Sequence, residues 1–467
     1  MVADERIEHD ALGEVRVPAQ AYWGAETQRA VDNFPVSGRP MPAAFIRALA
    51  LLKRCAAETN MELGLLEPER GKALVQAAQE VVDGKWSDQF PIDVFQTGSG
   101  TSTNMNLNEV LARRANEIGG HELGSRWVDA HDHTNIGQSS NDVIPSSVHL
   151  SSARALHEEL LPALRELQSA LEDKTRDFDD VVKSGRTHLQ DAAPVRLGQE
   201  FSGYARQVAL GAERLERARD ELLELALGGT AVGTGLNAHP EFARRTIARI
   251  AKVTRLDFRE AHNHFEAQGS MDKAVSASGA LRAAAVSLYK IANDVRWLGS
   301  GPHNGIGELR LPALQPGSSI MPGKVNPVMS ESLMMVCCQV VGNDAAVALG
   351  GLSGNFELNT FLPLLARNLL ESIELLGNAA RNFAVRCVRG LEADVDKCRA
   401  AVERNTMLVT ALAPRIGHEV AAAIALEAVR SGRTVRDVAR EKGVLPEAEL
   451  DALLDARRMT GPERADT

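Results

Sequence analysis

This sequence lacks an excess of basic residues and has few cysteines, and each of these features excludes a class of protein. The 52 lysines and arginines are outnumbered by 62 aspartates and glutamates, which gives a formal net charge of -10. Such a chain has no broad basic face to neutralise nucleic-acid phosphates, so we expect no nucleic-acid partner. The five cysteines make no even set and no C-x-x-C pair. This excludes the disulfide framework of a small secreted protein and favours a reducing compartment.

Long apolar runs are also missing. No run approaches the ~20 residues that span a bilayer, and residues 1–6 lack the apolar core of a signal peptide. We therefore expect a cytoplasmic protein without a membrane partner. Its 467 residues are enough for two or three domains with sizeable cores.

Strand-like alternation is scarce as well, and long helical patterns take its place. Between residues 194 and 228 apolar side chains recur at spacings of three, four and seven, which predicts one helix of more than thirty residues. Residues 273–298 repeat the pattern, and the opposite side of this second helix is also rich in Ala, Val and Ile. Helices so long and so apolar usually pack into a bundle, often against copies from other subunits.

The eleven residues 317–327, GSSIMPGKVNP, combine a hydroxyl-bearing loop, a cation and the start of a helix. Glycines permit a mobile middle and prolines stiffen the ends, so the segment has the composition of a lid. Asn326 and Pro327 are typical of a helix N-cap and first helical residue, which places Lys324 just before a helix N-terminus. A cation beside free helix N–H groups makes a site for an anion, most simply a carboxylate. A Ser/Gly loop that only caps a buried helix is the alternative.

Three other segments are rich in small residues. Residues 97–106, TGSGTSTNMN, lead into a helical pattern but lack the G-K-S/T ending of a phosphate loop. Residues 138–142, QSSND, supply neutral donors before Pro145, where we expect the next helix to begin. Residues 228–237 have the glycines of a dinucleotide loop but follow a helical pattern rather than a strand, which excludes a Rossmann site. By themselves the first two segments are equally consistent with helix caps.

Residues 184–192, SGRTHLQDA, contain the histidine best suited to chemistry, His188. An imidazole can transfer protons near neutral pH, although an isolated histidine is more often structural. Taken together with residues 317–327, these segments resemble those of the class II fumarase and aspartase superfamily. The resemblance extends over nearly the whole chain.

This resemblance implies a mainly α fold of three domains. They are an N-terminal, mostly helical domain over residues 1–139, a central helical bundle with the lid over residues 140–395, and a small helical C-terminal domain over residues 396–467. It also implies that five long helices of the central domain build the twenty-helix core of a homotetramer with shared active sites.

The resemblance further implies roles for individual residues. Ser318 is expected to be the catalytic base, and His188 is expected to pair with Glu331 near the leaving group. The residues expected to bind a small dicarboxylate are Ser99, Gly100, Thr101, Ser139, Ser140, Asn141, Thr187, Ser319, Lys324, Val325 and Asn326. An anti elimination through an aci-carboxylate needs no metal or organic cofactor, and we expect none.

The motifs also discriminate between members of the superfamily. His188, the pair Ser139 and Ser140, and residues 354–359 look like fumarase, which hydrates fumarate reversibly to L-malate. Residues 100–104, 326–329 and 435–438 look nearer to some aspartases. Fumarase is the preferred interpretation, and aspartate ammonia-lyase is the alternative. A non-catalytic helical scaffold is the remote alternative, because a pure scaffold has no packing reason to keep a mobile polar loop.

Many fumarases carry a second anion site on a His-Pro-Asn-Asp turn. The candidates for it here are Asp129, Ala130, His131 and Asp132, followed by His133. This sequence keeps one acid and moves the histidine, which argues against a working second site. A metal on His131 and His133 is the other hypothesis for the turn, and it would require further ligands.

Overall fold

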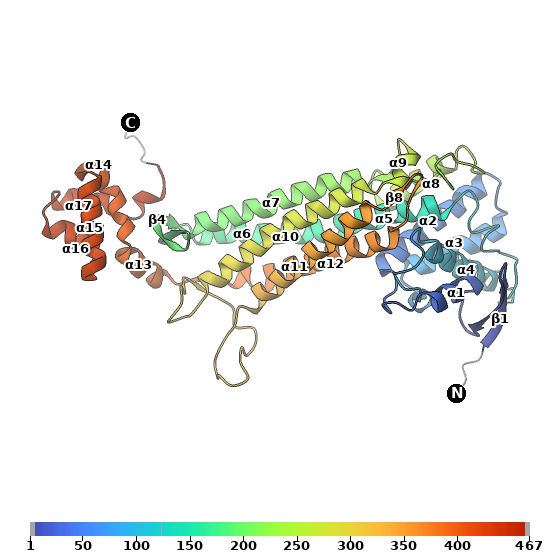
Figure 1. Cartoon of the computed structure of the whole chain (residues 1–467), viewed down its shortest axis with the longest axis horizontal. Coiled ribbons are helices and arrows are strands. Elements are labelled where there is room, and N and C mark those ends of the chain that lie inside the picture. Colours follow the sequence, from blue (N-terminus) through green and yellow to red (C-terminus); the bar gives the residue numbers. More distant parts are fainter. Residues whose placement is uncertain (1–4, 123, 463–467) are drawn as a thin grey trace. The chain divides into compact units, whose positions relative to one another are not determined.

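The computed structural model describes residues 5–122 and 124–462, and this part of the chain is mainly helical (61%; Figure 1). Residues 1–4, at the start of the segment expected to lack a signal peptide, lie outside the described residues. The chain divides into two compact units. The first holds Met1–Pro162, Gly211–Ala285 and Val336–Gly377, and the second holds Ala163–Leu210, Val286–Met335 and Asn378–Thr467.

The first unit is built around helix α2 (Ala43–Glu62), which is rich in Ala and Leu and buried along most of its length. It packs against α3 (Pro68–Val82), α5 (Ser140–Ala155) and α8 (Phe242–Thr254). The other elements of this unit are β1 (Glu5–Asp10), β2 (Gly13–Pro18), α1 (Ala25–Asn33), the 3-10 turn η1 (Ser87–Gln89), α4 (Thr101–Ile118), β5 (Glu224–Leu225), β6 (Arg259–Glu260), α9 (His264–Gly269), β8 (Gly354–Asn355) and β9 (Leu358–Asn359).

Five long helical stretches each continue from one unit into the other along the chain. They are α5 with the π-helical turn η2 (Leu156–Leu160) and α6 (Leu161–Asp177), then α7 (Leu197–Glu221), α10 (Asp272–Leu298), α11 (Val328–Gly351) and α12 (Leu362–Arg386). In the first unit a 2.7 Å hydrogen bond joins Ser278 of α10 to Asp344 of α11, and a 3.2 Å bond joins Asn343 of α11 to Ser372 of α12. These buried bonds fix the helix register, because a shift would leave the groups unpaired.

The second unit contains a hairpin of β3 (Val182–Thr187) and β4 (Gln190–Arg196), and a C-terminal cluster of helices around its own apolar core. Leu412, Ile424, Val438 and Leu450 are fully buried in that core. The remaining elements are β7 (Leu309–Arg310), η3 (Val388–Gly390), β10 (Glu392–Ala393), α13 (Val395–Arg404), η4 (Thr406–Ala411), α14 (Ala413–Ile416), α15 (His418–Ser431), α16 (Val435–Glu441), α17 (Glu447–Leu453) and η5 (Arg458–Thr460).

The predicted scarcity of strands is confirmed, since every sheet in the described part of the chain has two strands. The helix predicted over residues 273–298 is α10, which begins at Asp272. The helix predicted between residues 194 and 228 is too long: α7 has 25 residues. The β4 strand uses the start of that pattern, and β5 separates α7 from residues 228–237.

Two predicted helix starts are also wrong. α5 begins at Ser140 rather than at Pro145, because Ser139 and Asp142 form a capping box that completes the first turn ahead of the proline. α11 begins at Val328, so Pro327 rather than Asn326 precedes the helix. The Asn326 amide instead donates to the carbonyl of Gly317 at 2.6 Å.

Helix α11 is the one helix among the described residues that is apolar over nearly the length of a membrane span, a property that core helices share. By length and composition it is apolar enough to cross a membrane, and 44% of its most apolar stretch is buried within this chain. Met335 and Leu349 on this helix remain 68% and 65% exposed. Val286 and Trp297 on α10 are exposed as well. Apolar surface of this kind is typical of helices that pack against other chains.

Candidate active site

Two helix N-termini meet in the first unit, and they carry Ser99, Gly100, Thr101, Ser139, Ser140 and Asn141. Gly100 precedes α4 with a φ of +72°, and a Cβ at this position would lie 2.8 Å from Ile144 of α5. Only glycine permits both the left-handed backbone and the close approach. In the first turn of α4, Asn104 Nδ2 donates to the Ser140 hydroxyl oxygen at 3.1 Å. The structure thus brings the two predicted donor segments together, and paired helix N-termini favour an anion.

The N-terminus of α5 is held by Asp142, which is fully buried. One carboxylate oxygen accepts the N–H of Ser139 at 2.8 Å, and the other accepts those of Gly228 at 3.0 Å and Thr230 at 3.1 Å. Burial raises the pKa of Asp142, whereas the three N–H groups and nearby Lys53 favour its ionised form. The glycine-rich segment 228–237 therefore clamps a carboxylate of the chain itself, which explains its glycines without a nucleotide.

Thr187 and His188 lie at the tip of the β3–β4 hairpin in the second unit. His188 and Leu189 form its two-residue turn, with positive φ angles of 56° and 60°. Such turns usually contain Asn or Gly, because longer side chains are strained there. All three residues are exposed. Strain retained at an exposed turn with a polar side chain is typical of functional sites.

A buried ion cluster fixes the base of this hairpin, and sequence patterns did not reveal it. Lys183 Nζ lies 2.7 Å from Glu200 and 3.0 Å from Glu308. The other Glu308 oxygen accepts a hydrogen bond from Arg186 at 2.8 Å. Lys183 and Glu308 side chains are each 1% exposed. Glu308 lies shortly before residues 317–327 in the sequence. The cluster therefore connects the β3–β4 hairpin, which carries His188, to the chain segment that leads into the lid.

The lid is closed at its base by Gly317. Its N–H donates to the Lys324 carbonyl at 2.7 Å, and its own carbonyl accepts the Asn326 amide at 2.6 Å. A Cβ on Gly317 would lie 2.6 Å from the Lys324 carbonyl oxygen, so the closure requires glycine. These two hydrogen bonds of Gly317 hold the ends of the loop together, and residues 318–323 lie between the ends.

Within that loop the Ser318 hydroxyl oxygen faces two backbone N–H groups. It accepts the backbone N–H of Ile320 at 3.2 Å and that of Met321 at 3.0 Å. Successive N–H groups directed at one oxygen stabilise negative charge on it. These two N–H groups would stabilise an alkoxide if Ser318 lost its proton.

The other predicted residues of the second unit are open to solvent. Ser319, Lys324 and Val325 are exposed on the lid, and Glu331 is exposed in the first turn of α11. Among the described residues, no hydrogen bond or ion pair joins His188 to Glu331, and no side-chain partner is present for Lys324. The His188–Glu331 pair thus stays a prediction, and these side chains are available to a ligand or to another chain.

The turn proposed for a second anion is filled by its own carboxylate. Asp129 accepts the N–H groups of His131 at 2.8 Å and Asp132 at 3.0 Å, and the Arg126 guanidinium at 2.9 Å. Burial alone would raise the pKa of Asp129, but the Asp132 N–H and Arg126 outweigh burial and hold the pKa below its ordinary value. An external anion would have to displace this carboxylate.

The two histidines of the same turn have different partners. His131 Nε2 lies 2.8 Å from Glu26, and His133 Nε2 lies 2.9 Å from the Arg70 guanidinium. Over residues 5–122 and 124–462, no group of three or more His, Cys, Asp or Glu side chains is arranged to hold a metal.

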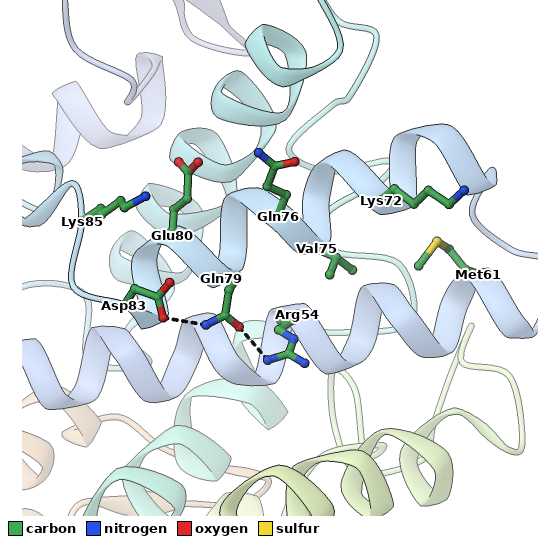
Figure 2. A pocket seen from close by; sticks show the side chains of 9 residues that line it. All are labelled: Arg54, Met61, Lys72, Val75, Gln76, Gln79, Glu80, Asp83 and Lys85. Carbon is green, nitrogen blue, oxygen red and sulfur yellow. Dashed lines mark hydrogen bonds between the residues drawn. The ribbon is translucent and has the colours of Figure 1, made fainter.

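A surface hollow of about 540 Å³ lies elsewhere in the first unit, between α2 and α3 (Figure 2). Its lining includes Arg54, Lys72, Lys85, Glu80 and Asp83. Charges of both signs neutralise one another there, and none of the predicted site residues lines it. The hollow is therefore separate from the candidate active site.

Comparisons with known proteins identify the family of the chain. Residues 13–342 match a family model described as Lyase, and residues 408–461 match one described as Fumarase C C-terminus. The class II fumarate hydratase of Mycobacterium tuberculosis is 52% identical over 470 residues, covering 100% of this chain and 98% of that protein. The class II fumarate hydratase of Halobacterium salinarum is 55% identical over 460 residues, covering 98% of each.

A solved structure shows the same likeness in three dimensions. The recombinant class II fumarase from Schistosoma mansoni is similar with a TM-score of 0.95 and 39% identity, covering 99% of this chain and 100% of that chain. The mainly helical fold is therefore fumarase-like along the chain. With two family models and full-length relatives in agreement, this chain belongs to the class II fumarate hydratases of the lyase family.

Proposed function

We propose that this chain interconverts fumarate and L-malate by anti addition and elimination of water through an aci-carboxylate intermediate. Removing a C–H proton beside a carboxylate leaves two negative charges on that group, so the site must bind this dianion more tightly than the substrate. The observation that carries the proposal is the Ser318 hydroxyl, which accepts two backbone N–H bonds on a largely exposed loop. Five free cysteines fit a cytoplasmic location.

We assign proton removal to Ser318. A serine hydroxyl is a weak nucleophile and base until its alkoxide is stabilised. The N–H groups of Ile320 and Met321 supply that stabilisation. The exposed Lys324 would add positive charge when the loop closes on the substrate. A base on a loop anchored at both ends can also retract to let substrate enter.

We assign the substrate carboxylates to the remaining donors. Those of the first unit are Ser99, Gly100, Thr101, Ser139, Ser140 and Asn141, and those of the lid are Ser319, Lys324, Val325 and Asn326. Lys324 and Asn326, beside the N-terminus of α11, would bind the aci-carboxylate. Removing one well-aimed donor from such a site typically costs about 3–4 kcal/mol of transition-state stabilisation.

We assign the leaving hydroxide to His188, Thr187 and Glu331. The departing oxygen must be protonated, either directly or through a water. His188 sits on a strained two-residue turn above a buried ion cluster, so its backbone position is closely defined. An exposed Glu331 could orient the imidazole or the water when another chain brings the two together.

We also propose a homotetramer whose active sites draw on three chains. Exposed apolar side chains on α10 and α11 need a cover, and another copy of these helices would supply it. Gly203, Gly279 and Gly342 lie within α7, α10 and α11 with open space beside them. Each costs about 0.5–1 kcal/mol relative to alanine in a helix. Close approach of helices from other copies would explain why these positions are glycine.

Ser318→Ala should lower kcat by about 10²–10⁴-fold, because the base is lost. Binding of a non-reacting dicarboxylate, measured by calorimetry, should stay within about threefold, because the other donors hold the anion. His188→Asn should lower kcat and should also weaken binding of the dicarboxylate. Ser431→Ala is the matched control, since this exposed serine bonds to the Glu427 carbonyl of its own helix. Full activity of Ser318→Ala would overturn the assignment of the base.

L-malate should be interconverted with fumarate, while L-aspartate should release negligible ammonia. A hydroxide leaving group needs an acid or a water near His188, and Ser140, smaller than the threonine usual in aspartases, leaves room for that water. Fumarate absorbance together with an ammonia assay makes the comparison on one preparation. A clear preference for L-aspartate would favour the ammonia-lyase alternative.

Leu349→Glu should break the assembly, because it places a charge on the exposed apolar face of α11. Burying an unpaired carboxylate costs several kcal/mol. Leu12→Glu is the matched control, since Leu12 is 82% exposed between β1 and β2. Light scattering should find a tetramer for the control and a smaller species for Leu349→Glu. A tetrameric Leu349→Glu variant would contradict the proposed use of this face.

Mixing two inactive variants should restore activity if the sites are shared. Thr101→Val and Ser318→Ala damage different segments, so a site that takes these segments from different chains can be intact in a mixed tetramer. After mild dissociation and reassembly of equal amounts, about a quarter of the sites should be intact. Mixed tetramers as inactive as their parents would exclude sharing between these two segments.

A further inference from the structure

A buried lysine lies beside the N-termini of α4 and α5 without a salt bridge to any described residue. Lys53 of α2 is 2% exposed, and its Nζ donates to the side-chain oxygen of Asn135 at 2.9 Å. Burial lowers the pKa of Lys53 to about 7, and the charge of Asp142 on α5 opposes that shift. In either protonation state the nitrogen keeps protons to donate to Asn135. A cation buried in this way costs stability, so packing does not explain it.

Lys53 and the Gln138 carbonyl together set the direction of a chain of amide groups. Nδ2 of Asn135 donates to the Gln138 carbonyl at 3.1 Å, so the atom of Asn135 that faces Lys53 is the oxygen, and Lys53 donates to it. That oxygen also accepts Nδ2 of Asn108 at 3.2 Å and, more weakly, Nδ2 of Asn104 at 3.4 Å. The Asn104 nitrogen donates in turn to Ser140 at 3.1 Å. Rotating the Asn104 amide would set its oxygen against the Asn135 oxygen, and the two would repel.

The chain of amide groups ends at the Ser140 hydroxyl. Because this oxygen accepts from Asn104, its proton is left to donate, and no described residue accepts it. A hydroxyl donor at paired helix N-termini matches what a substrate carboxylate requires. If the hydrogen bonds ran in the opposite direction, the Ser140 hydroxyl would donate its proton to the Asn104 oxygen. Only its lone pairs would then face the substrate carboxylate, which they would repel.

This network is a poor way to stabilise a fold. The side-chain oxygens of Asn104 and Asn108 are buried without a hydrogen-bond partner in the described part of the chain. Each has lost its bonds to water without replacement. Buried polar groups without partners that cluster beside a buried lysine are expected at functional sites rather than in an ordinary core.

We propose that Lys53 is a positioning residue for the substrate, which acts through Asn135 and Asn104 to hold the Ser140 hydroxyl as a donor to a substrate carboxylate. The inference rests on the proposed role of Ser140 as a substrate donor. Lys53 does not touch the substrate in this arrangement, and it influences binding more than proton transfer. Its removal therefore raises KM with little change in kcat.

The test is a double-mutant cycle with Lys53→Met and Ser140→Ala, measured as steady-state kinetics on L-malate. Ser140→Ala should raise KM about tenfold or more, as expected when a hydrogen bond to a charged group is lost. Lys53→Met should raise KM about fivefold alone but less than about twofold in the Ser140→Ala background, where no hydroxyl remains to be oriented. Its Tm should not fall, because an apolar side chain of similar length replaces a buried cation.

Thr59→Val is the matched control. Thr59 is fully buried on the same helix and donates to the Cys55 carbonyl at 2.9 Å, apart from the amide network. This variant should change Tm and leave KM unchanged. A purely structural role for Lys53 predicts the same behaviour for Lys53→Met.

An unchanged KM in folded Lys53→Met, or an equal rise in both backgrounds, would overturn the inference. If Lys53→Met does not fold, Asn104→Leu interrupts the network nearer to Ser140, and the same two backgrounds decide. If Ser140→Ala itself leaves KM unchanged, the proposed role of Ser140 is wrong, and the inference about Lys53 fails with it. If Ser140→Ala raises KM but Lys53→Met acts independently of it, the inference about Lys53 is wrong while the proposed role of Ser140 stands.

Discussion

The buried carboxylate of Asp142 is the interaction on which the donor half of the site depends. A buried carboxylate must be compensated, and three backbone N–H groups from two chain segments compensate it. These bonds simultaneously start α5, fold the glycine-rich segment 228–237 around it and leave the Ser140 hydroxyl at the helix end. The contact between Gly100 and Ile144 then brings the start of α4 to the same place. One compensated charge thus fixes two helix N-termini.

The proposed donors and the proposed base follow different structural rules. Donors on helix ends are held by buried contacts, so they can be preorganised for an anion before it arrives. Ser318 instead lies on a loop whose two ends are joined by hydrogen bonds, and its hydroxyl oxygen accepts N–H groups of the same loop, which would activate it as a base. The stabilisation of the alkoxide therefore moves with the loop. A base built in this way can leave and return without losing its activated state, whereas a base that depends on a distant partner could not.

How far the sequence predicts this site follows from how local each contribution is. Ser318, Gly317, Asn326 and Lys324 interact within eleven consecutive residues, so their pattern is visible in the sequence. The segments around Gly100 and Ser139 are visible for the same reason. The start of α5 was misplaced because Pro145 is a strong local signal, while the capping box that overrides it depends on side-chain geometry.

Residues whose roles arise from tertiary burial could not be found in this way. Lys53, Asn135 and Glu308 stand alone in unremarkable stretches, and only folding places a lysine next to an amide or a carboxylate next to Lys183 and Arg186. A single lysine within an Ala- and Leu-rich helix pattern is usually solvent-exposed.

The same limit applies to α11. Its partly exposed apolar surface and Gly342, which lies within the helix, follow helical spacing without indicating what packs there. Among residues 5–122 and 124–462 nothing covers these exposed apolar side chains, and the side chains of His188, Lys324 and Glu331 have no hydrogen-bond or ion-pair partner. Assembly with further copies would account for both features. It would cover the apolar side chains and would bring the three polar side chains next to segments of other chains.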